Sequence, residues 1–152
     1  MKEISFNIRV YGILINENKE ILVADETRFG IQFTKFPGGG LEFGEGTRDC
    51  LKRECLEELG QEVEILDHVY TTDFFQISAF NKTNQLISIY YFIKLISPAI
   101  FRVSAKKFDF ENLIPGAESF RWIPLNQISE KDFTFPVDKK VAEMIKNKYN
   151  PG

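Results

Sequence analysis

The chain has 152 residues, of which 43% are hydrophobic and 27% are charged, and its formal net charge at pH 7 is -3. This length predicts a single domain, residues 1–152, that is large enough to bury a substantial core. The small negative charge gives no global positive field for a nucleic acid, so no nucleic-acid partner is expected. A bound divalent cation would still supply local positive charge for a polyanionic ligand.

Neither a secretory leader nor a membrane span is expected. The first ten residues contain no continuous apolar run, and the most apolar stretch, Leu86–Ile96, is interrupted by Ser88 and Lys94. That stretch is also too short to cross a bilayer. The two cysteines, Cys50 and Cys55, are five residues apart on a predicted helix, so neither a disulfide nor a zinc pair is expected. We therefore expect a cytoplasmic protein with reduced cysteines.

The N-terminal third is predicted to be built mainly from strands. Alternating apolar residues predict a strand over Phe6–Ile15, and Ile21–Ala24 is predicted to pair with it as a hairpin. Asp25–Phe33 is expected to be a loop. Short extended segments are expected at Thr34–Phe36, because the following proline disfavours helix there, and at Leu41–Glu45.

A helix is predicted over Thr47–Leu59. Thr47 is a suitable N-cap residue, and Gly60 follows where helices commonly end. The predicted buried stripe consists of residues that recur at every fourth position, namely Leu51, Cys55 and Leu59. The acidic side chains lie on a neighbouring face of the same helix, so the apolar stripe can pack while they remain accessible.

The second half of the chain is predicted to hold three strands and a terminal helix. The strands are Val63–Phe75, Leu86–Leu95 and Ser119–Ile123, and the nearly continuous hydrophobicity of the second predicts a central position. Pro98–Gly116 is expected to be a long loop with a functional role. Val137–Tyr149 predicts an amphipathic helix. This order of elements predicts an α/β (α+β) fold in which helices cover both faces of a mixed sheet.

The glycine run Gly38–Gly40 and the helix that follows it indicate a metal site. Glu54, Glu57 and Glu58 are spaced three and four residues apart, which makes their carboxylates neighbours on the helix surface. A divalent cation such as Mg²⁺ would offset their repulsion and bridge to a phosphorylated ligand, which the glycines allow close to the backbone. Arg53 adjoins the glutamates and is suited to hold a carboxylate through a bidentate contact.

The polar residues have two other conceivable interpretations. A solvated acidic helix face is the alternative for the three glutamates taken alone. A metal site built from histidines, or a Ser-His-Asp triad, is not supported because His68 is the single histidine.

The spacing of the glycines and charged residues resembles the Nudix box. Gly39 is followed after five residues by Glu45, and after seven more by Arg53–Gly60, which reads RECLEELG. The box ends at Gln61, where the family usually has an aliphatic residue. The flanking segments Lys35–Pro37 and Arg121–Leu125 also resemble this family.

The resemblance to the Nudix hydrolase family implies a Nudix-like α/β/α sandwich with the sheet between helices. It implies metal-dependent hydrolysis of a pyrophosphate bond in a nucleoside diphosphate derivative, such as a nucleoside triphosphate or a nucleotide sugar. Mg²⁺ or Mn²⁺ is the implied cofactor, and a small nucleotide is the implied substrate. A water activated by the metal would attack phosphorus.

The resemblance also assigns roles to residues. The implied metal ligands are Glu54, Glu57 and Glu58, and the implied catalytic residues are Glu57, Arg53 and Glu54. Glu45 would brace the loop before the helix or help to reach the metal. The candidate substrate-binding residues are three glycines that permit close approach and one aromatic ring that is able to stack on a base: Gly38, Gly39, Gly40 and Phe36.

Several points stay open at this level. The general base is a helix glutamate, Glu111 or Glu118. The proline that marks many ADP-ribose hydrolases beyond the box is not evident, and Gln76 stands near its place. The alternative function is a nucleotide-sensing Nudix-fold module with little catalysis. Homodimers are common among similar proteins, but the sequence identifies no interface.

Overall fold

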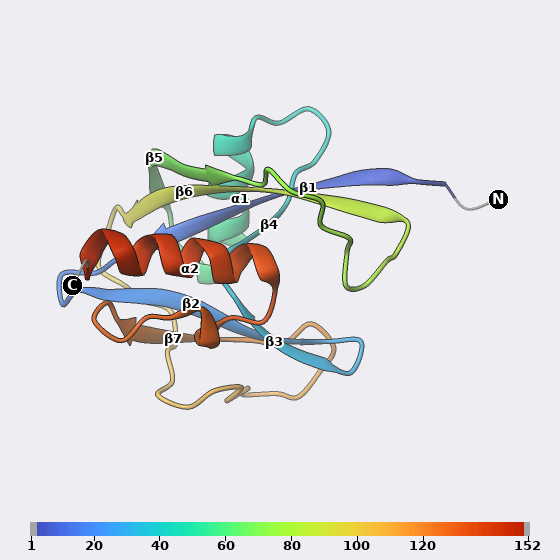
Figure 1. Cartoon of the computed structure of the whole chain (residues 1–152). Coiled ribbons are helices and arrows are strands. Elements are labelled where there is room, and N and C mark those ends of the chain that lie inside the picture. The colour runs from blue at the N-terminus through green and yellow to red at the C-terminus, as the bar shows by residue number, and fades with distance from the viewer. Residues whose placement is uncertain (1–2, 151–152) are drawn as a thin grey trace. The chain divides into compact units, whose positions relative to one another are not determined.

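The structure is a computed structural model that describes residues 3–150. It divides into two compact units that interleave along the chain (Figure 1). The first unit contains the described residues up to Ile13 together with Pro37–Ile100, and the second contains Leu14–Phe36 together with the described residues from Phe101 onward. Within residues 3–150, no helix is both long and apolar enough to cross a membrane.

The first unit is built on a sheet with the strand order β4-β1-β6-β5. Strand β1 pairs antiparallel with β4, and β5 pairs antiparallel with β6, whereas β1 and β6 run in the same direction, so the sheet is mixed (Figure 1). The prediction of a central position for the most hydrophobic strand is confirmed, because β6 lies inside the sheet. The strand bounds are Ser5–Leu14 for β1, Gly38–Gly40 for β4, Val63–Thr71 for β5 and Asn84–Leu95 for β6.

Helix α1 (Thr47–Leu59) packs against β4 and β5 through the predicted stripe. Leu51, Cys55 and Leu59 are all buried, and Cys50 joins them. The helix ends as predicted at Gly60, which adopts a left-handed conformation with φ 71° and donates its N–H to the Leu56 carbonyl.

The prediction that Thr47 is the N-cap is wrong. Gly46 occupies that position with extended backbone, and its carbonyl accepts the N–H of Cys50 at 2.9 Å. The Thr47 hydroxyl instead lies 2.7 Å from the hydroxyl of Tyr91, a buried residue of β6. The Thr47 side chain therefore forms a tertiary contact and does not cap the helix.

The second unit is built on an antiparallel sheet with the order β3-β2-β7. The buried residues of α2 include Val137, Val141 and Ile145, which confirms the predicted amphipathic helix. The element bounds are Glu20–Arg28 for β2, Ile31–Lys35 for β3, Glu118–Pro124 for β7, Glu130–Asp132 for the 3-10 helix η1 and Pro136–Tyr149 for α2.

The predicted loop over Asp25–Phe33 is wrong. Strand β2 continues to Arg28, the chain reverses through Phe29 and Gly30 at φ 52° and 75°, and β3 begins at Ile31. The segment is polar because it carries charged residues that the fold buries. Its polarity is therefore not a sign of a loop.

Three other boundaries differ from the predictions. The predicted hairpin between the first two strands is reduced to a single bridge, Ile15 to Ile21, because β1 pairs with β4 instead. Leu41–Glu45 is irregular, and the extended segment is the glycine run before it. Strand β5 ends at Thr71, so the last four residues of the predicted strand lie outside it.

A buried ion pair connects the elements of the second unit. Asp25 is 0% exposed, and its carboxylate accepts hydrogen bonds from Arg121 Nε at 2.6 Å and Nη2 at 3.0 Å. The hydroxyl of Thr34 donates to it at 2.7 Å, and the backbone N–H of Phe108 donates at 3.1 Å. One carboxylate therefore ties β2, β3 and β7 to the long segment between β6 and β7. Phe108 has φ 55°, a left-handed conformation.

We predict that Asp25→Asn lowers the free energy of unfolding by about 3–5 kcal/mol, because it leaves the charge of buried Arg121 without its partner. Urea unfolding at neutral pH measures the change. The matched control is Lys146→Gln, which removes an exposed contact to Glu143 at 4.0 Å and should cost less than about 1 kcal/mol. Equal losses in both variants would contradict a structural role for the buried pair.

Candidate metal and catalytic site

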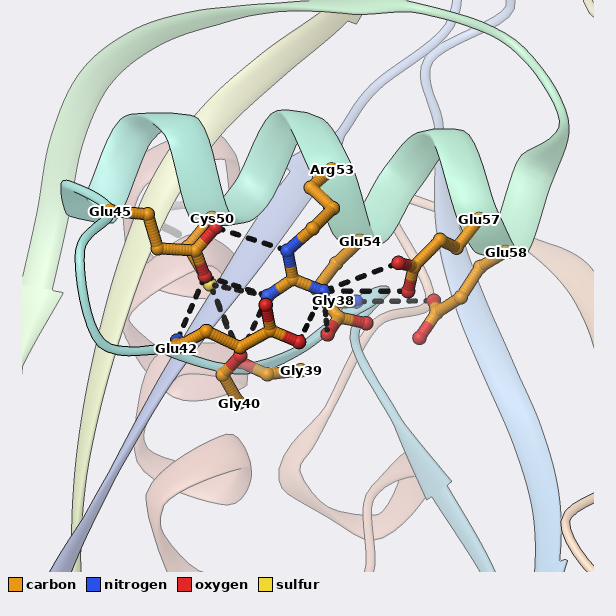
Figure 2. Close-up of polar contacts among 10 residues, drawn as sticks. All are labelled: Gly38, Gly39, Gly40, Glu42, Glu45, Cys50, Arg53, Glu54, Glu57 and Glu58. Atoms are coloured by element: carbon orange, nitrogen blue, oxygen red, sulfur yellow. Dashed lines mark hydrogen bonds and ion pairs between the residues drawn. The ribbon is translucent and has the colours of Figure 1, made fainter.

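Arg53 is the centre of the polar contacts on α1 (Figure 2). Its guanidinium forms a bidentate contact with Glu45, with Nε donating to Oε2 at 3.0 Å and Nη2 to Oε1 at 2.6 Å. Nη1 donates to Glu54 Oε1 at 2.9 Å, and Nη2 also donates to the carbonyl of Gly40 at 3.0 Å. A planar guanidinium presents its donors in this fixed fork, so Arg53 orients the loop, β4 and the helix together.

Glu45 closes the loop that leads into α1. Its Oε1 accepts the backbone N–H of Glu42 at 2.9 Å, in addition to the contact with Arg53. The hydrogen bonds from Arg53 and from the Glu42 backbone lower the pKa of Glu45 from its ordinary value of 4.5 to about 2. The same interaction raises the pKa of Arg53. Both groups therefore stay ionised throughout the neutral range, and the loop keeps its bracing contact.

The glycines of β4 make room for protein side chains. A Cβ at Gly39 would stand 2.5 Å from the Glu54 carboxylate, so that carboxylate reaches the backbone only because position 39 has no side chain. Gly38 has φ 140°, and its N–H donates to Glu58 Oε2 at 3.2 Å. The sequence predicted close backbone approach at these positions, and the groups that approach in this structure are the glutamates of α1.

Glu57 is more exposed than Glu54, the other helix glutamate that contacts Arg53. Its side chain is 59% exposed, compared with 16% for Glu54, and both of its carboxylate oxygens lie 3.4 Å from Arg53 Nη1. The longer contacts and the exposure leave Glu57 free to meet a solvent molecule or a ligand.

The three helix glutamates are held separately. Glu54 and Glu57 contact Arg53, whereas Glu58 contacts the backbone of Gly38. Within residues 3–150, no group of three or more histidine, cysteine, aspartate or glutamate side chains is gathered closely enough to hold a metal ion. Their mutual repulsion favours this separation. Joint binding of one cation therefore requires side-chain rotations that bring the carboxylates together.

Cys50 forms a second contact between α1 and the glycine run, and its sequence position indicates only a packing role. Its Sγ donates to the Gly40 carbonyl at 3.5 Å and lies beside Arg53 Nη2 at 3.8 Å. Burial, followed by the charge of Glu45, raises the pKa of the Cys50 thiol to about 12. The thiol is therefore protonated at neutral pH, and both cysteines are free, as expected.

Glu42 is a further residue that the sequence analysis missed. It contacts Arg53 Nη1 at 3.7 Å through a side chain that is 70% exposed. Its backbone N–H supports Glu45. The available signal was its place between the glycine run and Glu45, because a carboxylate in that short loop lies within reach of the same guanidinium.

Phe36 does not fit the expected role in substrate binding. Its side chain is 0% exposed, and its ring stacks on that of Phe133 at a centroid distance of 4.4 Å. Core packing in the second unit accounts for it. Gly40 has ordinary space around it, because the nearest atom to a Cβ there would be Arg9 Nη1 at 3.6 Å.

The other two candidates for the general base lie in the second unit. Glu111 is 71% exposed and forms an ion pair with Arg102 at 3.4 Å. Glu118 begins β7, directly opposite Glu26 of β2. The helix glutamates lie in the first unit, and among the candidate bases Glu57 is the one that contacts Arg53 through an exposed side chain.

Comparison with known proteins identifies the family to which this chain belongs. The chain matches the NUDIX domain over residues 6–144, and it therefore belongs to that family. The predicted membership of the Nudix family is therefore confirmed. The match extends over segments of both compact units.

The chain is similar to Nudix hydrolase 2 of Arabidopsis thaliana, with 29% identity over 135 residues. The matched region covers 85% of this chain and 43% of that protein, so the chain corresponds to less than half of the length of this relative.

Solved structures show the same fold at low sequence identity. A MutT protein from Methanosarcina mazei Go1 has a TM-score of 0.69 and 19% identity, with 99% of each chain covered. A NUDIX hydrolase from Nitrosomonas europaea has a TM-score of 0.66 and 20% identity, with 90% of this chain and 86% of that chain covered. These similarities confirm the predicted α+β fold of Nudix type.

We predict that Glu45→Gln destabilises the protein at neutral pH and that this difference disappears in acid. The folded-state pKa of about 2 lies below the ordinary 4.5, so the ionised carboxylate stabilises the fold above about pH 4.5. That contribution is lost as the pH falls through 2. Urea unfolding of both proteins between pH 7 and pH 2 measures this gap, which is the difference between their free energies of unfolding. A gap that stays constant over this range would contradict the ionic contact with Arg53.

Proposed function

We propose that this protein hydrolyses a pyrophosphate bond in a nucleoside diphosphate derivative with the help of a divalent metal ion. The observation that carries the proposal is the single guanidinium of Arg53, which contacts Glu45, Glu54 and Glu57 together. This arrangement supports the predicted roles, because the guanidinium holds Glu45 as a brace and leaves Glu54 and Glu57 on one face of the helix. Membership of the NUDIX domain family agrees with this activity.

The side chains of α1 fit a hard divalent cation such as Mg²⁺ or Mn²⁺. They offer carboxylate oxygens, which such cations prefer, and the Gly39 carbonyl lies in the same segment. Glu54 and Glu58 are four residues apart on one helix face, and both reach the glycine run of β4. We therefore propose Glu54, Glu57 and Glu58 as the metal ligands. When bound, the cation would neutralise pyrophosphate charge and lower the pKa of a coordinated water.

We assign the chain's own residues distinct roles in the reaction. Arg53 orients Glu54 and braces the loop through Glu45, without contacting the reacting atoms. Glu57 is exposed and loosely held, so we propose that it orients or deprotonates the attacking water. The glycine run leaves the backbone of β4 without side chains where a phosphate would approach.

The substrate class that we propose covers nucleoside triphosphates and nucleotide sugars. One solved structure with this fold, covering 99% of this chain at 17% identity and a TM-score of 0.62, is named a UDP-X diphosphatase. Others are named MutT. A panel of such compounds, assayed with Mg²⁺ or Mn²⁺ and with identification of both products, would define the substrate and the phosphorus that is attacked.

We predict that Glu57→Gln and Glu58→Gln each reduce kcat by about 10²-fold or more while the fold stays intact, because each removes a negative oxygen donor. Steady-state assays measure the rate, and circular dichroism checks the fold. Mn²⁺ binding, followed by electron paramagnetic resonance, gives a readout that does not depend on turnover. Glu62→Gln is the matched control, because Glu62 is an exposed residue just after α1.

The outcomes separate the proposed enzyme from the alternative module. Turnover by the unchanged protein, with losses in the two helix variants only, supports the enzyme. Tight nucleotide binding without product over long incubation would favour a nucleotide-sensing module. Unchanged rates in both helix variants would mean that the ligands are assigned wrongly.

We predict that Gly39→Ala weakens Mn²⁺ binding and lowers kcat/KM while folding is preserved. The new Cβ would stand 2.5 Å from the Glu54 carboxylate, and that flexible side-chain end would have to move. Gly40→Ala is the matched control for metal binding, because a Cβ there meets its nearest atom at 3.6 Å. Equal Mn²⁺ affinity in both variants would contradict the proposed position of Glu54.

A further inference from the structure

A small pocket lies on the first unit between α1 and the end of the sheet. It has a volume of about 240 Å³ and is lined by Arg48, Lys52, Val63, Glu64, Ile65 and Ile96. None of these residues takes part in the contacts of Arg53 described above. The volume is below the range of roughly 300–1,000 Å³ typical of sites for drug-sized ligands, so an occupant of this pocket must be small.

One side of the pocket carries two positive charges. Arg48 and Lys52 are four residues apart on α1, so their side chains are neighbours, and like charges at this spacing destabilise a helix. Among the residues that the structure describes, neither side chain forms an ion pair with a carboxylate. The helix thus retains an electrostatic cost that a bound anion would remove.

Arg48 is held in place by contacts that leave part of its guanidinium available. Its Nη1 donates to the carbonyl of Ile65 at 3.2 Å, and its guanidinium carbon lies 4.9 Å from the centroid of the Tyr91 ring. These two contacts fix its position beside β5 and β6. The other N–H groups of the fork remain able to bind a carboxylate.

The other side of the pocket is apolar. Val63 and Ile65 are 3% and 9% exposed, and Ile96, directly after β6, is 63% exposed. The acidic residue of the lining, Glu64, is paired with Lys94 at 3.3 Å. The pocket therefore joins a cationic wall to an aliphatic surface.

We propose that this pocket binds a small amphipathic anion, namely a carboxylate attached to a short aliphatic chain. The carboxylate would pair with Lys52 and the available N–H groups of Arg48. The aliphatic chain would lie against Ile65 and cover the exposed side chain of Ile96, which removes apolar surface from water. This site is separate from the proposed catalytic site, although α1 contributes to both.

The test is a calorimetric titration of the full chain with hexanoate at constant ionic strength and neutral pH, without nucleotide. Acetate keeps the charge but lacks the chain, and hexanol keeps the chain but lacks the charge. We expect saturable binding of hexanoate that is at least about tenfold tighter than that of acetate, since each buried methylene contributes roughly fourfold. Binding should also be at least about twofold tighter than that of hexanol, which lacks the charge contact. Equal binding of acetate and hexanoate, or no binding of hexanoate, would overturn the proposal.

Two lysine variants then locate the site. Lys52→Gln should weaken hexanoate binding about two- to fivefold, the value of an exposed charge contact, without affecting the fold. Lys82→Gln removes an exposed lysine from the turn before β6 and should leave binding unchanged. Equal weakening in both variants would show a general charge effect and overturn the assignment. Because the titration measures binding alone, its outcome does not depend on whether the protein hydrolyses pyrophosphates.

Discussion

The contact of Arg53 with Glu45 and Glu54 is the constraint on which the proposed site depends. One planar guanidinium connects the loop before α1, the helix itself and the Gly40 carbonyl of β4. A lysine has a single charged point and would not hold two carboxylates and a carbonyl in a fixed relation. The site geometry is therefore set by side-chain chemistry as well as by the backbone of the loop and helix.

The charges around Arg53 do not balance. Four carboxylates, those of Glu42, Glu45, Glu54 and Glu57, share one guanidinium, and Glu58 of α1 accepts a hydrogen bond from the backbone of Gly38. The low pKa of Glu45 shows that the brace is ionised at neutral pH, so it contributes to this excess negative charge. The excess is the physical reason that a divalent cation suits the proposed site. It also explains why the carboxylates are held apart in the structure.

The sequence predicts the bounds and the buried stripe of α1 well, because local signals are strong there. Helical periodicity identified the buried stripe, and Gly60 marked the end of the helix. The end of β2 and the start of β3 do not follow from the sequence, because Asp25 resembles a loop residue until its partner Arg121, 96 positions later, is known. Phe36 was misassigned for a similar reason, since only the fold shows that Phe133 covers its ring. Both errors come from long-range partners that periodicity does not report.

Helix α1 shows how one short segment can serve several purposes. Its buried stripe of Leu51, Cys55 and Leu59 packs on the sheet, and Arg53 with the glutamates occupies an adjacent face. Arg48 and Lys52 occupy another face beside the pocket. Because a helix repeats every 3.6 residues, neighbouring positions in sequence point to different faces. The pair Lys52 and Arg53 illustrates this, since two adjacent cations serve a proposed anion site and a proposed metal site. A shift of the buried stripe would therefore alter both sites together.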